Sequence, residues 1–404
     1  MRRIVITGMG GICALGHNAP DIWQAMSEGR SGIGPIQRLD RNWLRNDVIA
    51  AQISDFEPRA YIDEARLALC DPLSQYALVA AGEAIRQSGL DFRHERASRT
   101  AVVIGVGAAG EETREALYHK LYVEHATRFH PLGIVRIMSN APASQISMAH
   151  GITGPTFSVS SACASSNHAF AQAAMMIRAG MVDAAVAGGS EACVTVGVVR
   201  AWDAMRVLAP DTCRPFSINR RGLVLGEGSA MFVLETLESA QARGATILAE
   251  LAGIGMSADA GDIAAPSETG AAAAMQAALQ DAGMQPDAFD YINAHGTGTA
   301  ANDSTETRAI HRVFGDHARQ LAVSSTKPMH GHALGAAGAL EMIAAIGALR
   351  HGIVPPTLNY LGPDPVCDLD YVPHEARAMP VRAALNNSFA FGGLNAVVAV
   401  RQAP

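Results

Sequence analysis

The chain has 404 residues. At the usual size of a domain, this length suggests roughly two to three domains, and it leaves room for a large buried core. Apolar residues make up 49% and charged residues only 17% of the chain, against about 25% charged in an average soluble domain. We therefore expect much of the surface to be hidden in a large core or an oligomer interface. The net charge of −7, with no basic block, argues against a nucleic-acid partner.

The six cysteines are scattered along the chain without a C-x-x-C pair, which argues against a zinc ribbon and against a small disulfide scaffold. This pattern fits reduced thiols in a cytoplasmic compartment. The apolar stretch at the N-terminus breaks at glycines and is too short for a signal sequence, and no apolar run reaches the length of a membrane span. We expect a cytoplasmic protein with no membrane span.

Short β-branched runs, each followed by glycine and a helix-like segment, recur along the chain. The predicted strands are residues 3–7, 100–104, 156–160, 184–187, 248–252, 291–294, 321–324 and 396–400. The predicted helices include residues 73–88, 164–179, 271–282 and 338–349. This alternation predicts an α/β fold with largely buried sheets.

A weak internal echo suggests that the chain contains two similar halves. Residues 6–10 resemble residues 251–255, and residues 159–161 resemble residues 323–325. Residues 159–161 and residues 323–325 each precede a helix rich in Ala and Met that ends in Arg-x-Gly, at Arg178 and at Arg350. The shared order favours duplication over chance similarity, and it predicts an N-terminal half over residues 1–245 and a C-terminal half over residues 246–404.

Residues 105–110 match the pattern G-x-G-x-x-G after a predicted strand. A dinucleotide site would also need a second strand ending in an acidic residue about 20 positions later. Residues 111–122 are instead polar and helix-like. We interpret the glycines as a turn against a pocket, and a nicotinamide cofactor is not expected.

Cys163 stands where a predicted strand ends, small residues turn, and a long helix begins. The N-terminal end of a helix favours the nucleophilic thiolate, although a lone Cys in an apolar stretch is more often an inert core residue. Position alone therefore favours a reactive Cys163 only modestly.

Two histidines strengthen that interpretation. His295 and His332 each lie in a turn of small residues after an apolar strand, where the backbone can approach a ligand. A histidine N–H is suited to stabilising an oxyanion, and one Cys with two His residues at strand ends is expected for nucleophilic thiol chemistry. His330 and His332 could form half of a metal site, but no second pair of ligands accompanies them, so no metal is expected.

Residues 386–395 combine asparagines, two phenylalanines and two glycines just before the last predicted strand. The glycines beside Phe391 could let a bulky side chain swing or present a backbone N–H. The alternative is a tight turn with a core phenylalanine.

Four segments together resemble the signatures of the β-ketoacyl-[acyl-carrier-protein] synthases, of the elongating Cys-His-His type closest to synthase II. They are SAC at 161–163, NAHGTGT at 293–299, KPMHGH at 327–332 and NSFAFGG at 387–393. The similarity runs from Ile4 to about Val400, and residues 201–217 resemble the nodulation-protein-E-like branch of the family.

The resemblance implies a thiolase-like fold of two duplicated α/β halves in a five-layered αβαβα body, usually a homodimer. It implies that Cys163 accepts an acyl chain from an acyl-carrier-protein thioester, with an oxyanion hole formed by the backbone N–H groups of Cys163 and Phe391. His295 and His332 would stabilise the enolate left when a malonyl thioester loses carbon dioxide. The product would be a 3-oxoacyl-[acyl-carrier protein] in fatty-acid or specialised acyl-chain synthesis.

Further site residues follow from the same resemblance. Lys327 would balance the charge of the site through Glu306, and Glu341 would support the site without contacting the substrate. The remaining assignments are Thr297 and Thr299 for the phosphopantetheine arm, Ala108, Trp202 and Phe389 for the acyl chain, and Arg206 for docking of the carrier protein. The enzyme itself would bind no cofactor, because its substrates carry the phosphopantetheine.

Several positions depart from the family pattern, among them Ala108, Trp202, Ala264, His330 and Leu394. They put the substrate in doubt more than the chemistry. Three alternatives remain open: a thiolase, which would need a second catalytic Cys near the C-terminus; a non-enzymatic chain-length partner, which usually lacks the nucleophile; and a Cys–His hydrolase.

Overall fold

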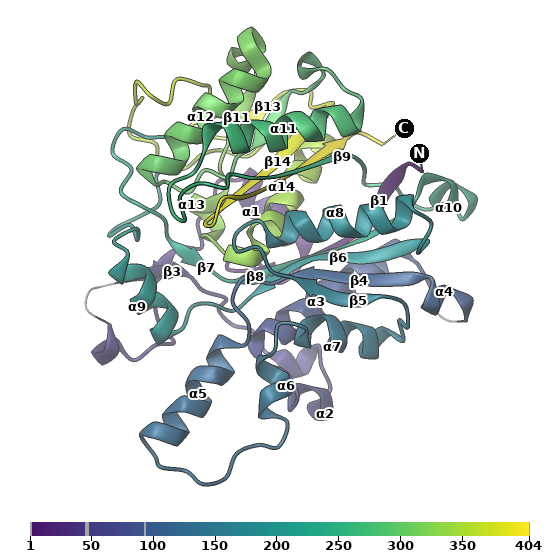
Figure 1. Cartoon of the computed structure of the whole chain (residues 1–404), viewed down its shortest axis with the longest axis vertical. Helices are drawn as coiled ribbons and strands as arrows, with labels where there is room; N and C mark the ends of the chain where they lie inside the picture. Colours follow the sequence, from purple (N-terminus) through teal and green to yellow (C-terminus); the bar gives the residue numbers. More distant parts are fainter. Residues whose placement is uncertain (1, 45–47, 93, 404) are drawn as a thin grey trace.

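The computed structural model of the protein describes residues 2–44, 48–92 and 94–403. Ten strands form one mixed sheet in the order β11-β10-β14-β15-β9-β1-β8-β6-β4-β5. The sheet divides into two five-stranded halves, which are joined only where Ile4–Ile6 of β1 pairs with Ala249–Leu251 of β9. Figure 1 shows the two halves stacked with helices outside and between them.

The two half-sheets have the same topology. In the N-terminal half the strands are β1 (Ile4–Cys13), β4 (Thr100–Gly105), β5 (Thr156–Val159), β6 (Ala184–Glu191) and β8 (Gly228–Thr236). In the C-terminal half they are β9 (Ala249–Ala258), β10 (Tyr291–Asn293), β11 (Ala322–Ser324), β14 (Ala383–Ala390) and β15 (Leu394–Arg401). When the strands of each half are numbered 1 to 5 in chain order, both half-sheets have the spatial order 3-2-4-5-1. Strands 2, 3 and 4 are parallel to one another, and strands 5 and 1 are antiparallel to their neighbours.

Six long helices complete five layers. On the outer face of the N-terminal half lie α3 (Pro72–Ser88) and α7 (Ala141–His150), and α11 (Glu268–Ala282) with α12 (Ala300–Phe314) covers the C-terminal half. Between the half-sheets lie α8 (Ser165–Arg178) and α14 (Ala337–His351). Residues 337–349 of α14 are buried on every side, which explains why this helix is apolar all round rather than along one stripe. These findings confirm the five-layered thiolase-like fold.

The remaining elements are short or peripheral. The helices are α1 (Ala19–Ser27), α2 (Glu64–Leu67), α4 (Glu95–Ser98), α5 (Glu111–Tyr122), α6 (Gly133–Ile137), α9 (Val196–Ala204), α10 (Leu237–Ala242) and α13 (Lys327–His330). Single 3-10 turns are η1 (Arg41–Trp43), η2 (Pro58–Ala60), η3 (Pro286–Ala288), η4 (Gly315–Arg319) and η5 (Leu334–Ala336). Two small sheets contain β2 (Gly34–Pro35), β3 (Ile49–Ala51) and β7 (Leu225–Gly226), and β12 (Ile353–Val354) with β13 (Arg377–Ala378).

The echo in the sequence falls on equivalent places in the two halves. Residues 6–10 lie in β1 and residues 251–255 in β9, the first strand of each half. A Cβ at Gly10 would lie 2.2 Å from the carbonyl oxygen of Ala80 in α3, and one at Gly255 would lie 1.9 Å from that of Ala274 in α11. Only glycine lets the outer helix lie this close to the strand, so the repeated glycines carry the same packing contact twice.

The eight predicted strands and four predicted helices are confirmed, with shifted ends. Two strands of the ten-stranded sheet were missed: β8, which is strand 5 of the N-terminal half, and β14, which is strand 4 of the C-terminal half. The segment expected to precede the last strand is mostly β14 itself. Asparagine is uncommon in central strands. Here Asn386 and Asn387 are buried and hydrogen-bonded to neighbouring elements rather than exposed in a turn.

The predicted division after residue 245 falls in the connection between α10 and β9, and this boundary stays a prediction. Among the described residues, no helix combines the length and the apolar character needed to cross a membrane.

Candidate active site

The chemically reactive residues follow equivalent strands of the two halves. Cys163 comes after β5, the third strand of the N-terminal half, and His332 comes after β11 and α13, the third strand of the C-terminal half and its following turn. His295 comes directly after β10. Because parallel strands end at the same edge of a sheet, the fold brings these side chains together across the interface between the halves.

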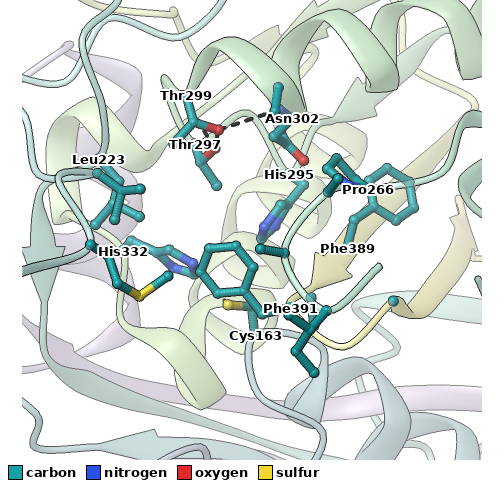
Figure 2. Close-up of a pocket in the computed structure, with 18 of the residues that line it drawn as sticks. Cys163, Leu223, Pro266, His295, Thr297, Thr299, Asn302, His332, Phe389 and Phe391 are labelled. Atoms are coloured by element: carbon teal, nitrogen blue, oxygen red, sulfur yellow. Dashed lines mark hydrogen bonds between the residues drawn. The ribbon is translucent and has the colours of Figure 1, made fainter. Parts of the chain in front are cut away.

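The three side chains meet in one pocket of about 250 Å³. Figure 2 shows Cys163 and His332 below His295, with Phe391 in front and Thr297 and Thr299 above His295. The lining residues are Cys163, Trp202, Met205, Val207, Leu223, residues 262–266, His295, Thr297, Thr299, Ala301, Asn302, His332, residues 389–391 and Gly393.

Cys163 sits on a tight turn before α8. Ala162 has a left-handed φ of 48°, a conformation that costs a non-glycine residue free energy and that often marks a functional site. No side chain caps the start of α8, and the N–H of its first residue, Ser165, donates to the carbonyl of Ala162 within the same turn. The Sγ atom lies 3.1 Å from Nε2 of His332.

Burial overrides the effect that the sequence led us to expect at this helix end. Cys163 is 4% exposed, and desolvation raises the pKa of its thiol to about 12, although Lys327 acts in the opposite direction. This rise opposes the thiolate that the helix N-terminus was expected to favour, so a base that accepts the thiol proton would assist nucleophilic attack.

His332 and His295 are both suited to be neutral. Burial lowers the pKa of each imidazole well below its ordinary value, and the nearby Lys327 ammonium lowers it further. Their rings lie 5.4 Å apart at an angle of 81°. A neutral imidazole carries one N–H and one free nitrogen, so each ring can donate or accept one proton but holds no charge of its own.

Lys327 fixes the tautomer of His295. Its Nζ lies 3.4 Å from Nδ1 of His295 and donates to the backbone carbonyl of the same residue. Because an ammonium can only donate, Nδ1 must accept, and Nε2 of His295 must carry the proton. His295 therefore presents an N–H donor on its other nitrogen.

The partners of Lys327 differ from the expectation. Its ammonium forms an ion pair with Glu341 of α14, not with Glu306. The pKa of Glu341 is raised to about 7 by burial, and Lys327 opposes that rise. Glu306 has another contact: its carboxylate accepts the backbone N–H groups of His295 and Gly296, both at 2.8 Å. Glu306 holds the backbone of the histidine turn, and Glu341 holds the lysine.

The same three residues could be considered as metal ligands, since one ligand atom from each of Cys163, His295 and His332 lies within 4.8 Å of the others. Two features oppose a bound cation. Nε2 of His295 carries a proton, and the Lys327 ammonium stands beside it. The sequence-based expectation of no metal and no cofactor stays a prediction.

Other predicted site residues divide into those that line the pocket and those that do not. Thr297 and Thr299 line it, with their hydroxyls 2.9 Å apart, and Phe389 lies beside the ring of His295. Trp202 stacks on Phe391 with ring centres 5.7 Å apart and an angle of 29°. Both aromatic rings thus form one wall.

Ala108 and Arg206 lie outside this lining. The backbone N–H of Ala108 donates to Glu191, and the acyl-chain contact expected of this residue stays a prediction. Arg206 is exposed just past the end of α9, with a left-handed φ of 57°. It forms no ion pair with another described residue, so its charge is free to meet a partner.

Sequence reasoning missed two parts of the site. Asn387 in β14 donates to Glu306 at 3.1 Å, and its place in the NSFAFGG segment was a signal. The buried Glu191 was the other, signalled only by an acidic residue at the end of an apolar strand. Residues 262–266, where Ala264 was noted as a departure from the family pattern, form part of the pocket wall, with the carbonyl of Ile263 accepting the N–H of Gly392 at 2.8 Å.

Glu191 also explains the glycine-rich turn at residues 105–110. The N–H groups of Gly107 and Ala108 both donate to its carboxylate. Donors already bound to a carboxylate cannot hold a pyrophosphate, which agrees with the interpretation of this pattern as a structural turn.

Comparison with known proteins places the site in a family. Residues 1–240 match the family described as Beta-ketoacyl synthase, N-terminal domain, and residues 248–361 match Beta-ketoacyl synthase, C-terminal domain. The chain is 54% identical over 401 residues to Nodulation protein E of Rhizobium sp. (strain N33), covering 99% of each chain. It is 42% identical over 402 residues to 3-oxoacyl-[acyl-carrier-protein] synthase 2 of Coxiella burnetii, covering 98% of this chain and 97% of the other.

A solved structure agrees over the whole length. The ishigamide ketosynthase/chain length factor superposes with a TM-score of 0.94 and 37% identity, covering 100% of both chains. Fold and site together define a thiolase-like condensing enzyme. The chain belongs to the β-ketoacyl synthase family, and it is an acyl-transferring enzyme that carries out a Claisen condensation in fatty-acid or specialised chain synthesis.

Proposed function

We propose that the protein condenses an acyl thioester with malonyl-[acyl-carrier protein] to give a 3-oxoacyl-[acyl-carrier protein]. One observation carries the proposal: the buried Cys163 thiol lies 3.1 Å from Nε2 of His332, beside a second imidazole, His295, whose Nδ1 lies 3.4 Å from the Lys327 ammonium. This arrangement supplies one nucleophile, one base and one oriented donor, which a two-step acyl transfer requires.

In the first step, Sγ of Cys163 attacks the carbonyl carbon of the acyl thioester. The thiol proton passes to Nε2 of His332 and then to the departing phosphopantetheine sulfur, so charge balances and the imidazole is again neutral. The ring nitrogen Nδ1 of His332 has no hydrogen-bond partner among the described residues. Because no partner fixes the tautomer, this ring can accept a proton in one step and donate in another.

In the second step, a malonyl thioester enters and loses carbon dioxide. The bond between its carboxylate and the α-carbon breaks, and the electron pair moves into an enolate whose oxygen accepts the N–H groups of His295 and His332. The enolate carbon attacks the acyl-Cys163 carbonyl, the new C–C bond forms, and the Cys163 sulfur leaves as a thiolate, which takes up one proton from solvent to restore the thiol. The N–H of His295, which Lys327 orients before the reaction, stabilises the developing charge without reorganising.

The other assigned residues serve substrate binding. We propose that the backbone N–H groups of Cys163 and Phe391 hold the oxygen of the tetrahedral acyl intermediate. Thr297 and Thr299 line the same pocket above His295 (Figure 2), and their hydroxyls suit the amide groups of a phosphopantetheine arm. Trp202 and Phe389 would contact the acyl chain.

We propose acyl-carrier protein as the macromolecular partner, since the name of the Coxiella burnetii relative specifies that substrate. Carrier proteins are acidic, and this chain has a net charge of −7, so attraction must be local and sensitive to salt. Arg206, which is exposed and forms no ion pair with the described residues, follows the pocket residue Met205 and is the best candidate for that contact. The relative named Nodulation protein E favours specialised over housekeeping chain elongation.

We further propose a homodimer in the cytoplasm. Strand β5 is an edge of the ten-stranded sheet, and an unpaired edge strand is a template for pairing with a second chain. The arm formed by α5 and α6 projects beside it (Figure 1) and carries exposed apolar side chains at Tyr122, Val123 and Ile134. Six free cysteines fit a reducing compartment.

The test is intact-protein mass spectrometry after incubation with a panel of acyl-carrier-protein thioesters. The proposal expects the mass of one acyl group on Cys163 and none after Cys163→Gln. An acyl group on Cys193 or Cys213, or on no cysteine at all, would overturn the assignment.

A further inference from the structure

The buried carboxylate of Glu191 takes no part in the proposed chemistry, yet it joins both halves of the site. It is the last residue of β6 and is 0% exposed. Its carboxylate accepts the N–H groups of Gly107 at 2.9 Å, Ala108 at 3.0 Å and Gly335 at 2.9 Å. Gly107 and Ala108 follow β4 in the N-terminal half, whereas Gly335 belongs to η5 in the C-terminal half.

The η5 turn connects two groups of the active site. It begins two residues after His332 and leads into α14, which carries Glu341, the partner of Lys327. Both backbone groups of Gly335 are held: its N–H donates to Glu191, and its carbonyl accepts the hydroxyl of Ser166 in α8. Ser166 lies three residues after Cys163, so one turn is tied both to β6 and to the helix of the nucleophile.

The η5 turn and the turn after β4 lie in direct contact, with no room for a side chain at either glycine. A Cβ at Gly335 would lie 2.1 Å from the backbone nitrogen of Gly107 and 2.9 Å from Oε2 of Glu191. A Cβ at Gly107 would lie 2.6 Å from the same carboxylate oxygen. The segments therefore pack backbone against backbone, with the Glu191 carboxylate between them.

We propose that Glu191 is a positioning residue that clamps the η5 turn to the N-terminal half and thereby sets the distance between His332 and the Cys163 thiol. Three convergent N–H donors need acceptor oxygens, and both oxygens of the Glu191 carboxyl group accept here. The inference rests on the proposed role of His332. It predicts that Glu191 matters more for the malonyl half-reaction than for acyl transfer, because His332 only assists acylation, whereas stabilisation of the enolate requires its aligned N–H.

The first test compares two substitutions of Glu191. Glu191→Ala removes every acceptor, so decarboxylation of malonyl-[acyl-carrier protein] should fall roughly 10- to 100-fold through loss of alignment. Glu191→Gln keeps one oxygen that can still accept the N–H groups of Gly107 and Gly335, so it should stay within about threefold of the parent. The KM for malonyl-[acyl-carrier protein] should change little in both variants.

Glu235 supplies the matched control. Like Glu191, it is 0% exposed. It lies near the C-terminal end of β8, far from the pocket, where its carboxylate accepts the hydroxyl of Thr7 and forms an ion pair with Arg243. Glu235→Ala should leave both half-reactions unchanged per folded molecule. If Glu191→Ala fails to fold, Glu191→Asp replaces it, because a carboxylate shortened by one carbon keeps the charge but loses the reach.

Three results would overturn the inference: parental decarboxylation in Glu191→Ala, an equal loss in Glu191→Gln, or an equal loss in Glu235→Ala. The His332→Ala variant separates this failure from failure of the proposed function. If His332→Ala decarboxylates at the parental rate, the role of His332 is wrong. If it does not, but Glu191→Ala does, only the clamp is wrong.

Discussion

The two halves of the molecule share one topology but carry different chemistry at corresponding strand ends. The third strand of the N-terminal half leads to Cys163, and that of the C-terminal half leads to Lys327 and His332. The second strand leads to the Gly107 turn in one half and to His295 in the other. The duplicated fold therefore supplies a nucleophile from one copy and proton donors from the other.

Burial determines the chemical roles of the two halves. The N-terminal thiol is buried, which raises its pKa to about 12, so a base from the other half assists its ionisation. The C-terminal imidazoles are held neutral by burial and by Lys327, so they can exchange protons without charging the pocket. Neither half is complete alone, and variants in each should fail in different half-reactions.

His295→Ala should give the largest separation of the two halves. The variant removes the N–H donor that Lys327 orients, and losing one such donor costs on the order of 10²–10³ in rate. The rate of malonyl-[acyl-carrier protein] decarboxylation, measured as release of carbon dioxide, should fall by that factor. Acylation of Cys163 should persist, and its loss in the same variant would argue that His295 serves both steps.

Lys327→Met should impair stability and decarboxylation together. It leaves Glu341 buried without its cation, and breaking such a buried pair costs about 3–5 kcal/mol. It also frees the tautomer of His295, so carbon dioxide release should slow about tenfold or more. The double variant Lys327→Met with Glu341→Gln is the control: chemical denaturation should show recovered stability, while the rate stays low. Recovery of both would show that the lysine acts only on folding.

Gly10→Ala and Gly255→Ala test whether the repeated glycines carry equivalent packing. Each new Cβ would press on a helix carbonyl of its own half, and such overpacking costs about 1–3 kcal/mol. Denaturant unfolding should show similar losses for both. Gly34→Ala, where no heavy atom lies within 4 Å of the added Cβ, should change little. A loss in one half alone would break the equivalence.

A smaller effect concerns pH. The pKa of Glu191 is raised to about 8 by burial, so the folded state holds this proton more tightly than the unfolded chain does. Its contribution to stability is present below the ordinary glutamate pKa and is lost as pH rises through about 8. Glu191→Gln cannot titrate, so its melting temperature should fall less between about pH 5 and pH 8. Parallel curves for parent and variant would contradict this.

The sequence was sufficient for the parts that depend on local pattern. Buried β-branched runs located eight strands, and Cys163, His295 and His332, each in a turn of small residues, marked the reactive turns. It was insufficient where tertiary contacts decide. β14 was missed because its asparagines are polar, and only the folded sheet supplies their partners. The ion pair between Lys327 and Glu341 and the raised pKa of Cys163 likewise depend on burial that no local pattern reveals.

The central claim is that the nucleophile and the decarboxylation donors come from different halves. It is tested most directly by measuring both half-reactions in Cys163→Gln and His332→Ala, with acyl-enzyme followed by intact mass and carbon dioxide release followed from malonyl-[acyl-carrier protein]. We expect that Cys163→Gln forms no acyl-enzyme yet still releases carbon dioxide, whereas His332→Ala is acylated more slowly but to completion, because Cys163 keeps its nucleophile and loses only the assisting base, and it releases carbon dioxide about 10²–10³ times more slowly. Loss of both half-reactions in both variants, or parental carbon dioxide release by His332→Ala, would contradict it.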